Sequence, residues 1–280
     1  MLAVSSLHTN NIKMTSMPAI HHQDRWVSAP DGCLYTRRWQ PNNPRSDVPI
    51  VLFHDSLGCV ELWRSFPAAL CTATRQPVIA YDRLGFGQSN ASATPLPLSF
   101  VDDEPTGSFA ALCQAYQITR FIALGHSVGG CMAVHCAGRY ATQCQGLITI
   151  AAQAFNETRT RRGIEEAQPA FQAPEQFAKL AKYHGDKARW VLNAWVDTWL
   201  SPAFAEWSLI PALEQVQCPT LVLHGEKDEY GSHRQPERIA RYTQGPAHCE
   251  MLPGIGHIPH REAEAVVVEF ARQFIARLAY

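Results

Sequence analysis

The chain reads Phe121-Ile-Ala-Leu-Gly125-His126-Ser127-Val128-Gly129-Gly130 near its middle, and this stretch decides the fold. An apolar run leads into a G-x-S-x-G turn followed by small residues, a pattern that predicts a buried strand, a sharp turn and a helix. Such a turn exposes the Ser127 hydroxyl at the carboxyl edge of a sheet. Gly125 and Gly129 are expected where the crowded backbone leaves no room for a side chain. Because G-x-S-x-G also occurs by chance in loops, the rest of the chain must decide what it means.

Length and composition limit the classes of protein. The chain has 280 residues, of which 46% are hydrophobic and 18% charged, and its formal net charge is −1. This length suits one large domain, or one domain with an insertion. A nearly balanced charge argues against nucleic acid or an anionic membrane surface as a partner. We therefore expect a small-molecule substrate and a monomer or homodimer.

Neither the termini nor the cysteines indicate export, a membrane anchor or a metal. No apolar run approaches the ~18 residues of a membrane span, and residues 1–22 lack the features of a secretory signal. We expect these residues to form a poorly ordered tail, with Met14 and Met17 as alternative starts to Met1. The nine cysteines show no C-x-x-C spacing, which predicts reduced thiols. A cytoplasmic protein without metal or cofactor is expected.

Hydrophobic periodicity predicts an α/β fold. Strands and helices alternate along the chain, and most of the strands are apolar throughout, which is typical of a mostly parallel sheet with helices on both faces. The eight predicted strands cover residues 26–27, 33–39, 49–53, 77–81, 121–124, 147–151, 220–224 and 248–252. The predicted helices cover residues 62–72, 99–117, 128–140, 235–242 and 261–278.

The alternation stops after residue 152 and resumes at residue 220. Residues 153–209 show helical patterns, no convincing strand and four of the seven tryptophans. We interpret them as a helical cap inserted into a core formed by residues 23–152 and 210–280. Trp190, Trp195 and Trp199 are candidate pocket residues, although aromatic residues at helical spacing more often belong to a core.

Two further motifs supply what a serine nucleophile needs, namely a base within hydrogen-bond reach and a group that orients the base. Asp228 ends the motif His224-Gly-Glu-Lys-Asp, which closes a predicted strand. His257 lies in Gly254-Ile-Gly-His-Ile-Pro, after the last predicted strand. Both side chains are therefore expected at the same sheet edge as Ser127. The order Ser, Asp, His is the one found in a particular group of serine hydrolases.

With a fourth motif, Tyr81-Asp-Arg-Leu-Gly-Phe-Gly-Gln-Ser89, the chain resembles the α/β-hydrolases over residues 24–280. The resemblance implies that Ser127 is the nucleophile, His257 the base and Asp228 its orienting acid. It also implies that the cap covers the site.

An oxyanion hole requires two backbone N–H groups near the serine. Val128 is expected to supply one of them and Ser56 the other. The loop that contains Ser56 reads His54-Asp-Ser-Leu-Gly58, with Asp55 where the family usually has glycine. Our hypothesis is that Asp55 makes a structural hydrogen bond within its own loop rather than contacting substrate.

Other residues compete for some of these roles. His260 is the nearest rival of His257 as the base, whereas His54, His126 and His224 are expected to support loops or the wall of the site. The alternatives to Asp228 as the acid are Glu157, Glu226 and Glu229.

The leading hypothesis is a hydrolase that cleaves a small, largely apolar ester through an acyl-enzyme. Relatives of this fold that use an aspartate nucleophile are disfavoured by Ser127, and proline iminopeptidases by Val128 and the H-D-S-L-G loop. A C–C bond hydrolase of the meta-cleavage type is the runner-up, weakened because Ile258 rather than tryptophan follows His257. Perhydrolase activity is a conceivable side reaction. A non-catalytic ligand sensor on the same scaffold is the alternative from another class.

Overall fold

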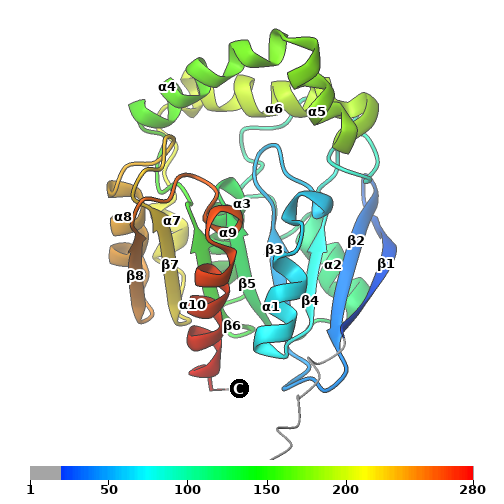
Figure 1. The fold of residues 1–280 in the computed structure, drawn as a ribbon, viewed down its shortest axis with the longest axis vertical. Helices are drawn as coiled ribbons and strands as arrows, with labels where there is room; N and C mark the ends of the chain where they lie inside the picture. The colour runs from blue at the N-terminus through cyan, green and yellow to red at the C-terminus, as the bar shows by residue number, and fades with distance from the viewer. Residues whose placement is uncertain (1–19, 280) are drawn as a thin grey trace, which may run out of the picture.

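The computed structural model describes residues 20–279, which form one eight-stranded sheet with helices on both faces (Figure 1). The strand order is β1-β2-β4-β3-β5-β6-β7-β8; β1 pairs antiparallel with β2 and β2 with β4, and all other pairs are parallel. The mostly parallel α/β sheet is thus confirmed. The strands are β1 (Ile20–Ala29), β2 (Gly32–Pro41), β3 (Ile50–Phe53), β4 (Val78–Tyr81), β5 (Phe121–His126), β6 (Cys144–Ile150), β7 (Thr220–Gly225) and β8 (Ala247–Leu252).

The predicted tail lies mostly outside the described residues. Residues 20–22 are described and belong to β1, where His21 pairs with Gln40 and His22 with Trp39. For these three residues the expected tail is therefore wrong, because backbone pairing with β2 continues the ladder to Ile20. Every helix within residues 20–279 is too short or too polar to cross a bilayer.

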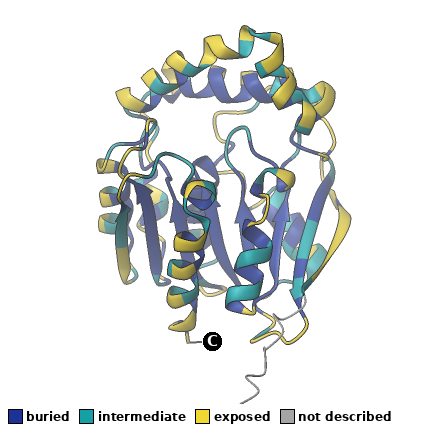
Figure 2. Ribbon diagram, viewed as in Figure 1, coloured by how far each residue is buried: buried dark blue, intermediate teal, exposed yellow. Residues whose placement is uncertain are grey.

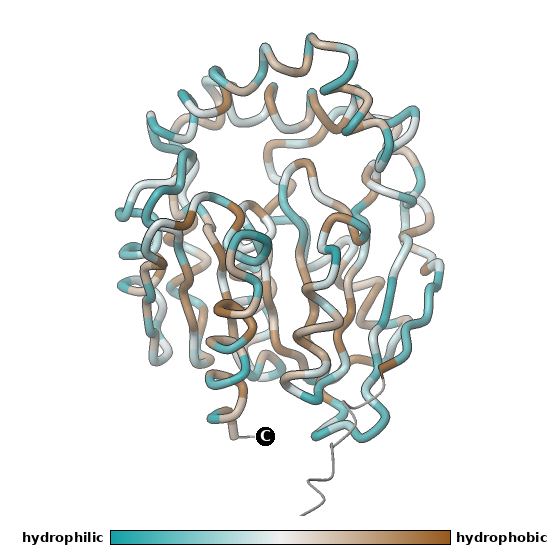
Figure 3. Tube along the Cα trace, in the orientation of Figure 1, coloured by the Kyte–Doolittle hydropathy of each residue, from teal (hydrophilic) through white to brown (hydrophobic). Residues whose placement is uncertain are grey.

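Two apolar layers enclose the sheet, whose central strands are buried along their whole length (Figure 2). The helices α1 and α10 cover one face, and α2, α3 and α8 cover the other. Figure 3 shows the hydrophobic residues concentrated in the strands and inner helix faces. The bounds of these helices are α1 (Phe66–Thr74), α2 (Ser108–Tyr116), α3 (Val128–Arg139), α8 (Arg234–Tyr242) and α10 (Glu264–Ala276).

Three predicted helices are shorter or divided. Residues 99–107 form turns ahead of α2, because Pro105 restricts the residue before it and Gly107 is a poor helix former. The 3₁₀ helix η1 (Val60–Trp63) precedes α1, and Arg64 between them adopts a positive φ of 54° that no continuous helix allows. A short helix α9 (Pro259–Glu262) precedes α10, and Ala263 separates the two at φ −141°.

The segment between β6 and β7 is helical, as expected for a cap, and its helices α4, α5 and α6 lie over the carboxyl ends of the strands (Figure 1). A single β-bridge between Phe155 and Ser208 joins the two ends of this segment. The exact limits at residues 153 and 209 stay a prediction. The elements of the segment are α4 (Thr158–Ala167), η2 (Gln168–Gln172), α5 (Pro174–His184), η3 (Gly185–Lys187), α6 (Ala188–Leu200), η4 (Pro202–Phe204) and α7 (Ile210–Leu213).

Candidate active site

Ser127 occupies a strained turn between β5 and α3. Its φ is 55° and its ψ −129°, a backbone conformation that residues other than glycine rarely adopt. The flanking positions must be glycine because a side chain would clash with the backbone. A Cβ on Gly125 would lie 2.1 Å from the carbonyl oxygen of Gly129, and a Cβ on Gly129 would lie 2.1 Å from the carbonyl oxygen of Phe53. The strand–turn–helix geometry that the motif predicts is therefore present.

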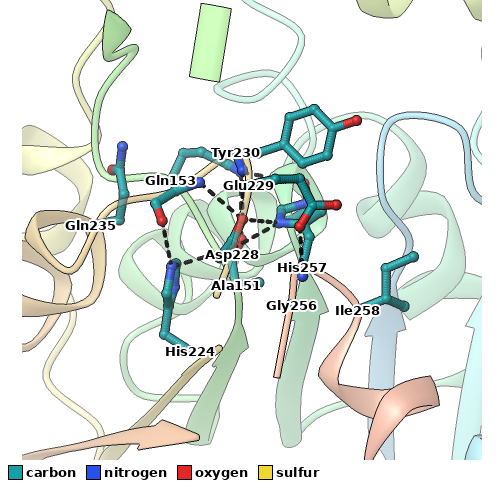
Figure 4. Close-up of polar contacts among 12 residues, drawn as sticks. Ala151, Gln153, His224, Asp228, Glu229, Tyr230, Gln235, Gly256, His257 and Ile258 are labelled. Carbon is teal, nitrogen blue, oxygen red and sulfur yellow. Dashed lines mark hydrogen bonds and ion pairs between the residues drawn. The ribbon is translucent and has the colours of Figure 1, made fainter. Parts of the chain in front are cut away.

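Ser127, His257 and Asp228 form a hydrogen-bonded chain at the carboxyl edge of the sheet. Ser127 Oγ lies 3.0 Å from His257 Nε2. His257 Nδ1 lies 2.9 Å from both carboxylate oxygens of Asp228 (Figure 4). Because an ionised carboxylate only accepts hydrogen bonds, Nδ1 of His257 carries the proton and Nε2 is free to accept from the Ser127 hydroxyl. This arrangement allows the imidazole to remove the hydroxyl proton.

Asp228 is fully buried yet well supplied with donors. The backbone N–H groups of Tyr230 and Gly231 donate to its Oδ1 at 2.8 and 2.9 Å. Burial alone would raise the pKa of Asp228, but the charge and hydrogen bond of His257 lower it. Conversely, burial alone would lower the pKa of His257, and the facing Asp228 carboxylate raises it. Each partner therefore favours the charged form of the other.

The rival acids have other partners. Glu157 accepts hydrogen bonds from Ser232 and Gln235, and it thereby fixes the loop after β7. Glu226 accepts the backbone N–H of Gly254. Glu229 accepts the backbone N–H of His257 at 3.2 Å, so it holds the base through the main chain.

The other histidines also have structural partners. His260, the rival base, is buried and packs against Trp63 and Phe66. Burial holds the pKa of His260 well below its usual range. His224 Nε2 lies 3.2 Å from Asp228 Oδ2, and it shares its hydrogen with the carbonyl of Gly231 at 3.4 Å. His224 is thus on the far side of Asp228 from His257 (Figure 4).

The loop after β3 faces the nucleophile and contains the departure from the family pattern. Asp55 Oδ1 accepts the backbone N–H of Leu57 at 2.9 Å, which is the hydrogen bond within the loop that the sequence led us to expect. Its Oδ2 lies 3.2 Å from His126 Nδ1. The carbonyl oxygen of Asp55 accepts two hydrogen bonds, from His54 Nδ1 at 2.8 Å and from Arg83 at 2.9 Å.

The two expected oxyanion donors are located at this junction. Ser56 lines the same cavity as Ser127. Val128 is the first residue of α3, and the first N–H groups of a helix have no partner within it. Their role in stabilising an oxyanion stays a prediction.

A cavity of about 360 Å³ opens over Ser127, between the core and the cap. Trp195 and Trp199 of α6 line it, as expected. Trp190 does not: its indole N–H donates to the carbonyl of Thr94, and the ring lines a different cavity. A position on a helix does not specify which neighbour the side chain meets, and a functional role for Trp190 stays a prediction. The lining residues are Asp55, Ser56, Leu57, Leu62, His126, Ser127, Gln153, Thr160, Ile164, Gln176, Trp195, Trp199, Tyr230, His257, Ile258 and Arg261.

Two polar residues beside Ser127 are not predicted by the motifs. Gln153 Nε2 lies 3.4 Å from Ser127 Oγ, and the Tyr230 ring packs edge-on against His257 with centroids 4.8 Å apart. Both follow a strand that ends at the site, β6 and β7 respectively, and that position is the signal which points to them. Within residues 20–279 no group of three or more His, Cys, Asp or Glu side chains is arranged to hold a metal ion.

Comparison with known proteins agrees with this architecture. The "1-acylglycerol-3-phosphate O-acyltransferase ABHD5" of Sus scrofa is 30% identical over 116 residues, 41% of this chain and 33% of that protein. The "Serine hydrolase BPHL" of Mus musculus is 25% identical over 203 residues, 66% of this chain and 65% of that protein. The chain therefore spans between a third and just under two thirds of the length of these curated relatives.

Solved structures share the fold over nearly the whole chain. The proline iminopeptidase of Mycobacterium smegmatis has a TM-score of 0.67 at 22% identity, and the alignment covers 91% of this chain and 99% of that one. A sequence profile described as "Alpha/beta hydrolase family" matches residues 50–270. With that match and the eight-stranded fold, the chain belongs to the α/β hydrolase family.

Proposed function

We propose that the protein is a serine hydrolase that cleaves a small, largely apolar ester through an acyl-enzyme. The observation that carries the proposal is the continuous hydrogen-bonded chain from Ser127 through His257 to Asp228, which ends in a cavity of about 360 Å³. A serine hydroxyl is a weak nucleophile unless a base stands within hydrogen-bond reach. Here the base is present, correctly oriented, and beside a space that accommodates a substrate.

The geometry supports a two-step reaction. As Ser127 Oγ attacks the acyl carbonyl, His257 Nε2 takes the hydroxyl proton, and the buried Asp228 stabilises the imidazolium that forms. His257 then returns the proton to the leaving alcohol. Water then attacks the acyl-enzyme, with His257 as the base that takes its proton. The bond between Ser127 Oγ and the acyl carbon breaks, the acid leaves, and His257 returns the proton to Ser127. The backbone N–H groups of Ser56 and Val128 are proposed to bind the oxyanion of each tetrahedral intermediate.

The walls of the cavity suggest the kind of substrate. Ile164, Trp195 and Trp199 of the cap, together with Leu57 and Leu62 of the core, supply apolar surface around the reacting centre. Apolar walls with a few convergent polar groups are typical of small-molecule sites. We propose a short acyl chain or a compact apolar alcohol as the group that occupies this space.

The test uses p-nitrophenyl acetate and p-nitrophenyl butyrate with the wild-type protein and the Ser127→Ala variant. We expect hydrolysis of at least one ester and a loss of about 10³-fold or more in the variant. A fluorophosphonate probe should label the wild type and leave the variant unlabelled. Ser28→Ala, on the exposed edge strand β1, is the matched control for serine removal and should retain full activity and labelling.

Two results would contradict the proposal. Hydrolysis that persists unchanged in Ser127→Ala would show that another group is responsible. The absence of both hydrolysis and labelling in the wild type would leave the non-catalytic sensor as the better account of the scaffold. If the wild type is active, a series of p-nitrophenyl esters of increasing acyl length measures how long an acyl chain the cavity accepts.

A further inference from the structure

The ring of His126, the residue before the proposed nucleophile, is held between two acceptors. Its Nε2 lies 2.8 Å from the carbonyl oxygen of His257, and its Nδ1 lies 3.2 Å from Asp55 Oδ2. The side chain of His126 is only 2% exposed, so solvent is not an alternative partner, whereas that of Asp55 is 25% exposed. Neither contact is explained by the proposed triad chemistry.

The two acceptors determine how many protons the ring carries. A carbonyl oxygen has no hydrogen to give, so Nε2 must donate to it. A neutral imidazole has only one N–H, and the remaining nitrogen would then direct its lone pair at a carboxylate oxygen. A buried ring in that state would lose one hydrogen bond and gain a repulsive contact. A doubly protonated ring satisfies both acceptors.

We propose that Asp55 holds His126 as an imidazolium, and that this ion pair positions the backbone of His257 against the nucleophile turn and the oxyanion loop. The positioning role, unlike the charge state, rests on the proposed function. Asp55 belongs to the loop after β3, His126 to the end of β5 and His257 to the loop after β8. One ring thereby fastens the three loops that contain the proposed oxyanion donor, nucleophile and base.

The surroundings of the pair favour an ionised Asp55 carboxylate. Burial alone would raise the pKa of Asp55, but the hydrogen bond and charge of His126 lower it strongly, with the N–H of Leu57 adding to the effect. The other titratable groups that face the pair are His54, Arg83, His184, His257, His260 and Arg261. The His260 ring packs edge-on against His126 with centroids 4.6 Å apart, and burial keeps it neutral by lowering its pKa. Asp55 is the carboxylate that contacts the His126 ring, with its Oδ2 3.2 Å from Nδ1.

The pair also accounts for aspartate where the family usually has glycine. A glycine at residue 55 would leave Nδ1 of His126 without its anion, and a neutral ring would then suffice for the single bond to His257. Asp55 and His126 are positioning residues in this account, because they act on the reacting groups through the main chain of His257 and not by proton transfer. The second hydrogen bond of Asp55, to Leu57, fixes the carboxylate in place.

Nitrogen-15 NMR of the histidine rings tests the charge state directly, without any substrate. At pH 7.5 the wild-type protein should show both His126 nitrogens protonated, with the signal assigned by its loss in His126→Gln. His224 is the internal reference, because its Nδ1 has no partner within residues 20–279 and burial lowers its pKa, so it should show one protonated and one bare nitrogen. An unprotonated ring nitrogen on His126 in the wild type would overturn the proposal.

Asp55→Asn tests the positioning role. The amide keeps the shape and an acceptor for Leu57, but it removes the anion, so His126 should become singly protonated. We expect kcat for p-nitrophenyl butyrate to fall roughly tenfold to hundredfold, as displaced catalytic groups do, with KM nearly unchanged. An unchanged kcat in a variant whose His126 has lost its second proton would refute the positioning role. A fall in thermal stability together with a rise in KM would indicate a merely structural role.

A second histidine–carboxylate pair on the protein serves as the matched control. His135 Nε2 lies 3.1 Å from Asp102 Oδ1, in a surface region outside the cavity over Ser127. Asp102→Asn breaks that pair and should leave both kcat and the His126 signals as in the wild type. If the wild type hydrolyses no ester and resists fluorophosphonate, the proposed function fails, but the NMR result still decides whether His126 is an imidazolium.

Discussion

Two histidine–aspartate pairs lie side by side at the carboxyl edge of the sheet, and they differ in what the second ring nitrogen faces. In the pair His257–Asp228 that nitrogen faces the Ser127 hydroxyl at 3.0 Å. In the pair His126–Asp55 it faces the carbonyl of His257 at 2.8 Å. A hydroxyl gives up a proton and a carbonyl never does, so the first ring is able to cycle protons and the second is not. The group that faces the second ring nitrogen therefore determines whether the histidine transfers protons or only positions the backbone.

The largest expected effect comes from the first pair. Asp228→Asn places an amide where the carboxylate fixes the tautomer of His257, and the wrong tautomer presents an N–H to Ser127. We expect kcat to fall about 10⁴-fold, measured with a p-nitrophenyl ester. Glu226→Gln is the matched control on the same loop and should remain within threefold of the wild type. A loss below tenfold in Asp228→Asn would show that Asp228 does not orient the base.

The acid limb of the pH profile should belong to the first pair alone. His257 must be neutral to accept the Ser127 proton, and Asp228 raises the pKa of His257 above its ordinary value of 6.5 against the opposing effect of burial. Activity is therefore present above that pKa and is lost as the pH falls through it, about tenfold per unit below the midpoint. The measurement is kcat/KM from pH 5 to 9. A midpoint at or below pH 6.5 would contradict the raised pKa.

The first pair and the fold can be predicted from the sequence for the same physical reason. Strands buried on both faces must be apolar throughout, so 121–124 and 220–224 stand out in the chain, and the ends of parallel strands meet at one edge. The motifs that follow those strands therefore place Ser127, Asp228 and His257 together. The helix predicted over 99–117 is wrong for residues 99–107, because Pro105 and Gly107 outweigh the apolar spacing there.

The two residues of the second pair can be found in the sequence, but their contact with each other cannot be predicted from it. His126 and Asp55 both stand in recognisable motifs, yet 71 residues separate them, and their contact depends on how the loops after β3 and β5 are folded. Likewise, nothing in the spacing of Trp190 and Trp195 tells that only the second lines the cavity over Ser127. Side-chain neighbours across loops are set by tertiary packing, which no local pattern records.

A smaller effect is expected from His224, which contacts Asp228 on the side opposite His257. Its N–H is shared between Asp228 Oδ2 and the carbonyl of Gly231, and the carboxylate keeps two backbone donors without it. His224→Gln should therefore reduce kcat by about twofold to tenfold, the range of a single net hydrogen bond. Steady-state kinetics checks this. A loss as large as that of Asp228→Asn would mean that His224 belongs to the proton-transfer chain.

The smallest effect concerns stability in acid, where both aspartates contribute through depressed pKa values. A carboxylate whose pKa is lower in the folded state stabilises the protein above its unfolded pKa of about 3.9, and this contribution is lost as the pH falls. Asp55→Asn should therefore lose less stability than the wild type below about pH 4, where the Asp55 carboxylate titrates. Between pH 6 and 8 the wild type alone should lose stability as the pH rises, because only the wild type keeps His126 doubly protonated when the unfolded chain releases that proton. Urea unfolding midpoints across this range measure the difference. If the two curves stay parallel down to pH 3, Asp55 is not held ionised by His126, and the contrast between the two pairs disappears.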